Sequence, residues 1–345
     1  MKRRQSVACV ALALALVVAF VAAVGIGSVP VPPRSLIRVV LNGIGIPGVA
    51  APDQQDVAIL LFLRLPRVLA AMLVGASLAV CGVVMQGLFR NPMASPEILG
   101  LSAGGSLGAV TAITTGLAGV SLFTMPLLTI AGALVSAVCI YALSTSRGTT
   151  SLLFIVIAGM AISSLFNALT SGLLLFSREY EVSQYLFWTM GGLDGRTWQH
   201  ILFSAPLLVP GIVVLCLFSR ELNLFALGEE GASALGVGVE RTKRLMLAIS
   251  AVVTGVAIAV SGPIGFVGLL VPHLMRLIVG PDHRGLMPAS ALGGALFLVC
   301  CDLVGRAIAP PYEIRVGLIT ALLGSPYLIV LLVRTQRRGA RVLMP

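Results

Sequence analysis

The sequence predicts an all-α, polytopic membrane protein with about ten transmembrane helices and an inverted internal repeat. The first observation is composition: 58% of the 345 residues are hydrophobic and 10% are charged, whereas soluble proteins carry about 25% charged residues. The second is a succession of long apolar runs, which at about 20 residues per span leave room for about ten helices. The third is a sequence similarity between the two halves of the chain. These observations exclude a soluble, disordered or disulfide-stapled protein.

The apolar runs give the expected spans, in chain order. They are residues 7–29, 65–89, 98–117, 122–143, 152–176, 198–218, 244–261, 268–280, 286–308 and 314–333. The first follows three basic residues, as in a signal peptide, but it is longer than the 7–15 residues of a signal-peptide core. We therefore expect an uncleaved first helix. The proline-bearing stretch at residues 30–52 is predicted to be an external loop.

The distribution of basic residues predicts the orientation in the membrane. Ten spans put both termini on one side. If that side is the cytoplasm, fifteen of the 23 Lys and Arg residues fall inside and eight outside. This asymmetry is the one that cytoplasmic loops show. It predicts a multi-pass protein of the cell (inner) membrane with both termini cytoplasmic, and it accounts for the net charge of +10 through membrane lipid, without nucleic acid as a partner.

Three arginines on the predicted outer side lie at the ends of apolar runs: Arg64, Arg67 and Arg306. They could reach up to lipid headgroups, or form an external basic rim that docks an acidic partner. Asp302 lies four residues before Arg306, which is the spacing of an ion pair on a helix.

The two halves of the chain show a repeated pattern. Residues 75–82 (GASLAVCG) are similar to residues 255–262 (GVAIAVSG), and the same offset of 180 residues aligns Pro92 with Pro272. The first copy runs inward and the second outward, so the repeat is inverted, as is common in transporters. Chance similarity in glycine-rich apolar sequence is the alternative. We expect one domain over residues 1–345, with repeat halves at about 57–176 and 239–334.

The third span carries Gly100, Gly104 and Gly108 four residues apart, which is the pattern of a helix-packing seam. A phosphate-binding loop of the Walker A type needs a lysine, and the chain has only Lys2 and Lys243. If the protein takes part in active transport, ATP hydrolysis would therefore belong to another subunit. No catalytic cluster, metal-ligand spacing or paired cysteine motif is visible, so we expect a non-catalytic protein without a metal or cofactor.

The fifth span has a stripe of uncharged polar residues at helical spacing, which includes Met160, Ser163, Ser164, Asn167 and Ser171. Such groups face other helices or water when a helix spans a membrane. Hydrogen bonding between helices and the lining of a pathway both remain open. The stripe carries no charge, which suits a bulky cargo better than a tightly bound ion.

The largest inner loop holds a second pattern. Residues 222–237 predict two short helices broken at Gly228, with Glu229 and Glu230 in the favourable first turn of the second helix. The apolar periodicity of this loop beside the membrane predicts docking of a cytoplasmic partner.

Several long motifs resemble the permease subunits of type II ATP-binding-cassette (ABC) importers, the FecCD-like family that imports iron–siderophores, haem and cobalamin. They are residues 64–67 (RLPR), 75–76 (GA), 85–96 (MQGLFRNPMASP), 188–192 (WTMGG), 224–229 (LFALGE), 262–273 (GPIGFVGLLVPH) and 324–327 (GSPY). The similarity covers nearly all of the chain after the first span. Two positions depart from the family pattern: Glu313-Ile314 is followed by Arg315 rather than proline, and Met93 replaces the usual leucine.

The resemblance implies the partners and the residues that meet them. A second copy of the chain, or a paralogous permease, would complete a dimer with two cytoplasmic ATP-binding subunits and a periplasmic or lipid-anchored substrate-binding protein. It implies docking of the binding protein at Arg64, Arg67 and Arg306, a translocation path along the stripe of the fifth span together with the tenth span, and an inner gate near residues 149–153. ATPase coupling is implied at Phe225, Leu227, Gly228, Glu229, Glu230, Ala234 and Leu235.

The expected function is that of a permease subunit for a ferric chelate, and the expected chelate is a siderophore. Residues 94–100 (ASPEILG) look more like the iron–siderophore members of the family than its cobalamin members. Import of haem or cobalamin by the same architecture is the alternative. An ion-driven secondary transporter is a rival of another class. It would need carboxylates within the membrane, and Asp302 alone comes close.

Overall fold

The computed structural model describes residues 2–27, 29–43, 51–146 and 148–342, most of them helical. Within these residues, seven helices are long and apolar enough to cross a membrane. They are α1 (Lys2–Gly25), α4 (Leu65–Leu88), α6 (Thr124–Ser144), α7 (Leu152–Leu175), α9 (Trp198–Leu217), α12 (Val239–Ser261) and α14 (His283–Ala307). Two shorter apolar helices are α5 (Leu101–Thr114) and α13 (Val267–Val279). The long helix α15 (Val316–Val342) has a shorter apolar part, residues 316–331. These helices follow the order of the expected spans, which confirms the all-α, polytopic membrane fold.

The second span begins earlier than the sequence predicts. A short helix α3 (Gln54–Ala58) continues through the π-helical turn η1 (Ile59–Arg64) directly into α4, giving one helical segment from Gln54 to Leu88. Proline is favoured in the first turn of an α-helix, and Pro66 stands in the first turn of α4, just after the π-helical turn ends. The predicted loop before this span also contains helix α2 (Pro33–Gly43).

The remaining described elements are short. They are the 3-10 turns η2 (Pro96–Leu99) and η3 (Leu117–Gly119), helices α8 (Glu179–Thr189), α10 (Ser219–Phe225) and α11 (Glu229–Ala234), and strands β1 (Thr145–Ser146) and β2 (Thr149–Thr150). The two strands form an antiparallel hairpin in which Thr145 lies opposite Thr150. This hairpin joins α6 to α7.

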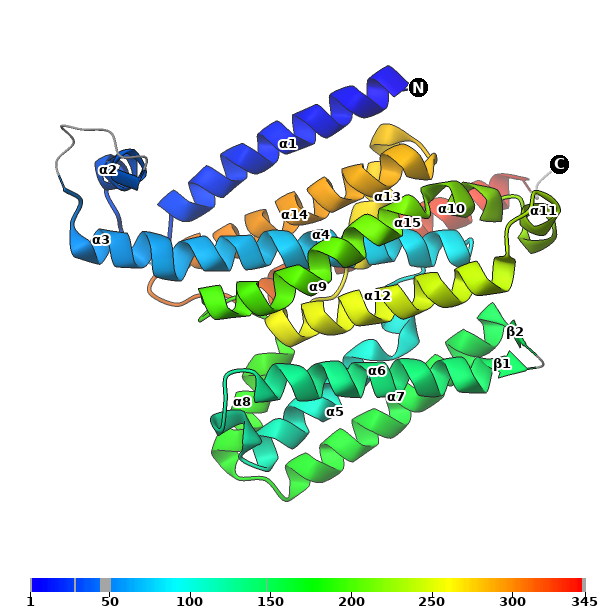
Figure 1. Cartoon of the computed structure of the whole chain (residues 1–345), viewed down its shortest axis with the longest axis horizontal. Coiled ribbons are helices and arrows are strands. Elements are labelled where there is room, and N and C mark those ends of the chain that lie inside the picture. Colours follow the sequence, from blue (N-terminus) through cyan, green and yellow to red (C-terminus); the bar gives the residue numbers. More distant parts are fainter. Residues whose placement is uncertain (1, 28, 44–50, 147, 343–345) are drawn as a thin grey trace.

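The helices form two groups, as Figure 1 shows. Helices α1, α14, α4, α9 and α12 lie alongside one another, and α6, α5 and α7 form a second group that meets the first through α12 and α6. The start of α1 and the end of α15 lie at the same end of the bundle as α10, α11 and the hairpin. We call this the terminal end. The start of α4 lies at the opposite end with α2 and α3, here called the Arg67 end.

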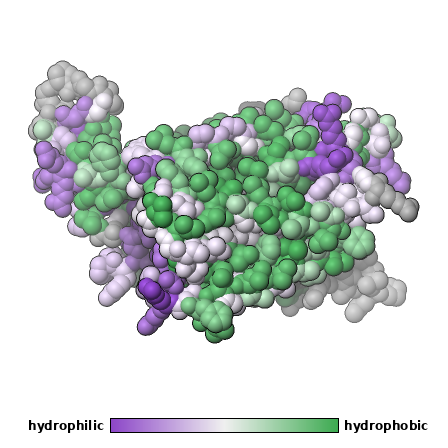
Figure 2. All heavy atoms as spheres, turned by 60° about the horizontal axis from the view of Figure 1, so that its bottom comes forward, coloured by the Kyte–Doolittle hydropathy of each residue, from purple (hydrophilic) through white to green (hydrophobic). Residues whose placement is uncertain are grey.

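The surface is apolar where a bilayer would surround it. Figure 2 shows a broad hydrophobic area over the middle of the molecule, with hydrophilic residues gathered toward its two ends. Many large apolar side chains are exposed on α1 and α7, among them Val18 and Leu153. This pattern is that of a multi-pass membrane protein, in which lipid takes the place of water around the helices.

Glycines let the main helices approach to backbone contact. A Cβ on Gly75 of α4 would overlap the carbonyl group of Gly294 in α14, and a Cβ on Gly104 of α5 would overlap that of Gly132 in α6. Close backbone approach at small residues is how helices associate in membranes. The predicted seam of the third span is confirmed at Gly104 and at Gly108, which meets the backbone of Leu128.

The two halves share an order of elements rather than a residue register. A long, a short and two long helices follow one another in α4–α7 and again in α12–α15, and the short helices α5 and α13 both begin after a residue of positive φ, Gly100 and Phe266. Gly82, however, lies inside α4, whereas Gly262 follows the end of α12. The 180-residue offset predicted from the sequence therefore does not match equivalent positions in the two helices.

Candidate functional site

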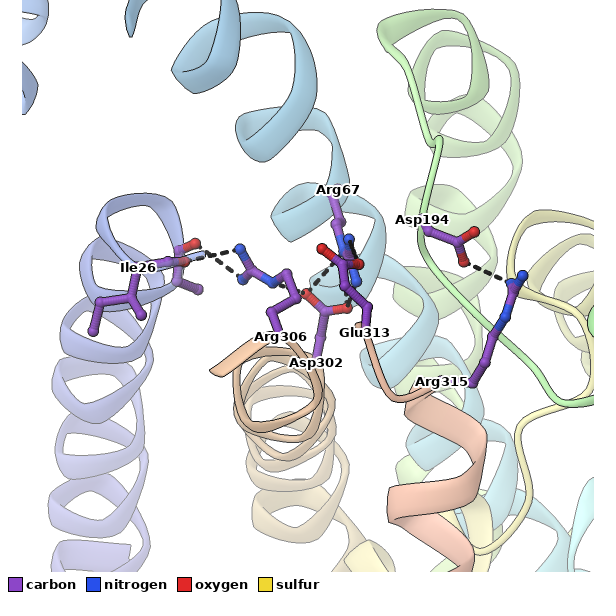
Figure 3. A network of polar contacts seen from close by, with 8 residues as sticks. Ile26, Arg67, Asp194, Asp302, Arg306, Glu313 and Arg315 are labelled. Carbon is purple, nitrogen blue, oxygen red and sulfur yellow. Dashed lines mark hydrogen bonds and ion pairs between the residues drawn. The ribbon is translucent and has the colours of Figure 1, made fainter. Parts of the chain in front are cut away.

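The Arg67 end holds a buried charge cluster, shown in Figure 3. Asp302 of α14 accepts from Arg67 Nη2 at 2.9 Å and pairs with Arg306 Nε at 3.0 Å. The Asp302 and Arg306 side chains are each 2% exposed. Arg67 also pairs with Glu313 at 2.6 Å. The ion pair predicted from the i,i+4 spacing of Asp302 and Arg306 is confirmed, and a second arginine completes it.

Two of the three arginines that the sequence predicts to be external also cap the end of α1. Arg64 donates to the carbonyl oxygens of Val24 at 2.9 Å and Gly25 at 2.6 Å. Arg306 donates to Ala23 at 3.0 Å and Ile26 at 2.9 Å. The last carbonyls of a helix lack partners within the helix, so the two guanidinium groups supply the missing donors.

This arrangement corrects the expectation of an exposed basic rim. Arg64 is 5% exposed and Arg306 is 2% exposed, because the carbonyls of α1 and the carboxylate of Asp302 draw both side chains inward. A cavity of about 290 Å³ nevertheless reaches Arg64, Arg67 and Arg306 together with Asp194 and Glu313. A docking group would have to enter this cavity rather than rest on a rim.

Arg315, the departure from the family pattern, has a defined place in the structure. It pairs with Asp194 at 2.6 Å and lies over the ring of Phe187, 5.4 Å from its centroid. The pair ties the start of α15 to the segment between α8 and α9. Asp194 gave no signal in the sequence, because a single acid in a glycine-rich loop has no informative spacing.

At the terminal end, α10 and α11 confirm the two predicted short helices and the break at Gly228. Gly228 has φ +97°, a conformation that glycine adopts at no steric cost. The predicted coupling residues divide into two sets. Phe225 is buried in the core and Gly228 is half-buried, whereas Leu227 is 65% exposed. The other exposed members are Glu229, Glu230, Ala234 and Leu235.

A cavity of about 660 Å³ lies beside α10, at the turn between α13 and α14. Asp282 caps α14 by accepting from the backbone N–H of Arg284 at 3.1 Å, and it accepts from Asn223 of α10 at 2.7 Å. These two hydrogen bonds lower the pKa of Asp282 below its usual value. Asn223 also accepts from the backbone N–H of His283 at 2.9 Å. The amide therefore fixes α10 to this turn.

The polar stripe of α7 stays together in part. Met160, Ser164, Asn167 and Ser171 are all exposed on this helix. Ser163 is different: it faces the junction of η2 and α5, where it leaves no room for a side chain at Gly100. The exposed four residues recur at i, i+4, i+7 and i+11, so they lie on one side of the helix. Uncharged polar groups there interrupt an apolar surface.

A comparison with known families decides the class of protein. The model of the FecCD transport family matches residues 15–334. The chain belongs to the FecCD transport family.

FecCD relatives with different cargoes are similar to this chain. The cobalamin import permease BtuC of Halobacterium salinarum is 47% identical over 78% of this chain and 72% of its own length. The hemin permease HmuU of Yersinia pestis is 42% identical over 80% and 84%. The Fe(3+) dicitrate permease FecD of Escherichia coli is 39% identical over 90% and 93%.

A solved structure has the same fold. It is described as an inward-facing conformation of a metal-chelate type ABC transporter, and it matches 94% of this chain and 98% of its own with a TM-score of 0.83 and 34% identity. As a FecCD family member, the chain is a multi-pass membrane permease of an ABC importer. The resemblance found in its motifs is thereby confirmed.

Proposed function

We propose that this chain is the transmembrane permease subunit of an ATP-driven importer that moves a ferric chelate, a siderophore, across the cell (inner) membrane. The observation that carries the proposal is the exposed stripe of α7. Uncharged hydroxyl and amide groups on a lipid-length helix are more stable against protein or water than against lipid. A path lined by such groups lets a bulky, polar cargo pass without binding it tightly.

A second copy of the chain, or a paralogous permease, would cover this stripe. α7 is among the least buried of the long helices, with 17% of its apolar window inside the subunit. Pairing two such faces encloses a path between the subunits and removes polar atoms from contact with lipid. We include α15 in the path because the motif of its helix resembles the family's tenth span.

Two ATP-binding subunits would dock at the terminal end on α10 and α11. Leu227 and Leu235 offer apolar contacts, and Glu230 offers a charge beside them. None of the glycine-rich segments of the chain carries the lysine of a Walker A loop, so ATP hydrolysis is assigned to those subunits. This assignment makes the terminal end cytoplasmic and places both termini in the cytoplasm, in agreement with the excess of basic residues on that side.

A substrate-binding protein would dock at the Arg67 end, periplasmic or lipid-anchored according to the host. Its acidic side chains would enter the cavity lined by Arg64, Arg67 and Arg306. Charge reversal at Arg67, the least buried of the three, is expected to weaken binding of that protein, and the loss should be larger at low salt. Unchanged affinity would limit the three arginines to holding α1 and α14.

The ferric chelate is proposed from residues 94–100. The Fe(3+) dicitrate permease is similar to this chain over 90% of its length, although the cobalamin and hemin permeases are more identical to it. Haem and cobalamin are the second candidates, since two relatives import them. An ion-driven mechanism fits the geometry less well. Asp302, the acid nearest to an intramembrane site, is neutralised by two arginines and 2% exposed, which leaves no free carboxylate there to bind a proton or sodium ion.

The test is uptake of radiolabelled ferric siderophore, haem and cobalamin by cells with and without the gene, each strain complemented by the intact gene. Loss of ferric-chelate uptake alone is the expected result. Loss of haem or cobalamin uptake would keep the mechanism and replace the cargo. Normal uptake of all three would contradict the proposal.

A further inference from the structure

Lys243 is a buried cation at the terminal end that no motif singled out. Its side chain is 3% exposed although it lies only one helical turn from the start of α12. Lysine is almost never fully buried unless it is paired. Arg241 and Arg244 on the same turn are exposed, so Lys243 is the buried one of the three basic side chains on this turn.

The ammonium group of Lys243 meets acceptors from three segments. It binds both carboxylate oxygens of Glu229 in α11, at 3.0 and 3.1 Å, and Glu240 of its own helix at 3.3 Å. It also donates to the carbonyl oxygen of Thr150 at 3.0 Å. An ammonium has three N–H donors, and Glu229, Glu240 and Thr150 together use all of them.

Thr150 is held from a second direction. Its backbone N–H donates to Glu240 at 3.1 Å and its hydroxyl donates to the other oxygen of the same carboxylate. Thr150 is the last residue of the β1–β2 hairpin, and the next residue, Ser151, is the N-cap of α7. Lys243 and Glu240 therefore bind the chain at Thr150, immediately before the N-cap of α7.

α7 otherwise packs against α5 and α6, which belong to the second group of helices. The contacts of Lys243 thus form a short, continuous path from α11 through α12 to the start of the helix that carries Met160, Ser164, Asn167 and Ser171. Coupling between sites is carried by networks of this kind when both ends can move.

We propose that Lys243 is the positioning residue that fastens α11 to the start of α7, so that displacement of α11 by an ATP-binding subunit is transmitted to the helix lining the path. This inference rests on the proposed function. It goes further by naming the link between the docking helix and the path. Lys243 is inside the subunit, so it acts through Glu229 and Thr150 and does not contact the ATP-binding subunit or the cargo.

The experiment uses the complete transporter, with its ATP-binding subunits and binding protein, in proteoliposomes. Lys243→Gln removes the buried charge, and Arg244→Gln is the matched control because it removes an exposed charge from the next position. Lys243→Gln is expected to co-purify with the ATP-binding subunits and to hydrolyse ATP, while transport per ATP hydrolysed falls by about tenfold. Arg244→Gln is expected to keep the wild-type ratio.

A second comparison separates loss of the Glu229–Lys243 interaction from a general loss of structure. If Glu229 and Lys243 act as one unit, the double variant Glu229→Gln/Lys243→Gln should show the same transport-to-ATPase ratio as Lys243→Gln alone, and not the product of two losses. If Lys243→Gln does not accumulate, Glu240→Gln replaces it, since that change keeps the ammonium of Lys243 but weakens the hydrogen bonds that Glu240 accepts from Thr150. A reduced ratio in Glu240→Gln is then the expected result.

Three outcomes would overturn the inference. The first is that Lys243→Gln, or its substitute Glu240→Gln, transports as much cargo per ATP hydrolysed as Arg244→Gln. The second is that Lys243→Gln loses the ATP-binding subunits, which would place the residue in the docking surface. The third is that the two substitutions of the double variant act independently. Failure of the wild-type transporter to move any ferric chelate, haem or cobalamin would instead count against the proposed function. The wild-type measurement therefore separates the two.

Discussion

Asp302 shows how single residues with opposite charges are buried together in this protein. Its carboxylate lies between Arg67 and Arg306, and Arg306 turns its remaining donors to the end of α1. A charge taken out of water is tolerated only when partners and hydrogen bonds replace the lost solvent. The role of the aspartate is therefore to permit two buried guanidinium groups rather than to add stability of its own.

Replacement of this aspartate tests that role. Asp302→Asn leaves two buried arginines without their common counter-charge and is expected to lower the free energy of unfolding by about 3–5 kcal/mol. Glu313→Gln is the control, because Glu313 is 27% exposed and also pairs with Arg67. Thermal unfolding in detergent measures both variants. A loss in Asp302→Asn no larger than that in Glu313→Gln would contradict the burial argument.

Asp282 gives a prediction about pH. Its pKa is lowered in the folded protein by hydrogen bonds from Asn223 and the Arg284 backbone, so the stability it contributes is present above the unfolded value of about 3.9 and is lost as pH falls through the lower, folded value. Asp282→Asn keeps a good helix cap but cannot titrate. The melting temperature of the wild type is expected to fall more steeply than that of Asp282→Asn below about pH 4.

At the scale of elements, the packing of α4 on α14 depends on the absence of side chains at the crossing. Gly75 and Gly294 bring the two backbones into contact. Gly172 of α7 is a glycine in a long helix with open space around the position of a Cβ. The two positions therefore separate the cost of filling a packing contact from the ordinary effect of glycine on a helix.

Alanine at both positions makes the comparison. Gly75→Ala gains helix propensity but forces α4 away from α14, for a net loss of about 1–3 kcal/mol. Gly172→Ala is expected to be neutral or to stabilise the helix by up to about 1 kcal/mol. Chemical denaturation in the same detergent gives the two values. Equal effects would show that α4 and α14 can separate without cost.

The elements also show how far sequence reasoning reaches. The apolar runs located the seven long and three shorter apolar helices of the described residues. They could do so because a segment that crosses lipid must satisfy all its backbone hydrogen bonds internally, which an α-helix does. They missed α2, because the prolines and glycines at residues 30–52 favour a loop. They also missed α3 and the π-helical turn, which precede the predicted start of the second span at residue 65. Arg64 was placed on the correct end but not in the correct environment, because its partners are carbonyls of α1 and carbonyls leave no signature in a sequence.

At the scale of the whole molecule, the exposed face of α7 predicts where water enters the assembled transporter. Asn167 lies on the polar stripe, and Leu165 lies on the same helix, exposed but turned away from it. If two subunits enclose a path along the stripe, a thiol at position 167 meets water and one at position 165 meets lipid or protein.

Cysteine labelling in membranes tests this arrangement. In a background with the six native cysteines replaced by alanine, Asn167→Cys is expected to react with a water-soluble methanethiosulfonate reagent at least about tenfold faster than Leu165→Cys, because the reagent requires a solvated thiolate. Bound cargo should slow the reaction at position 167. Equal rates at the two positions would mean that the stripe is sealed between helices.

The helix α1 begins and the helix α15 ends at the same end of the bundle. One copy of the gene could therefore be joined to another by a short linker that never has to cross the lipid. The resulting tandem polypeptide would carry two permease halves that can be mutated separately. Placing Lys243→Gln in one half alone would then show whether a transport cycle needs both subunits to respond or only one.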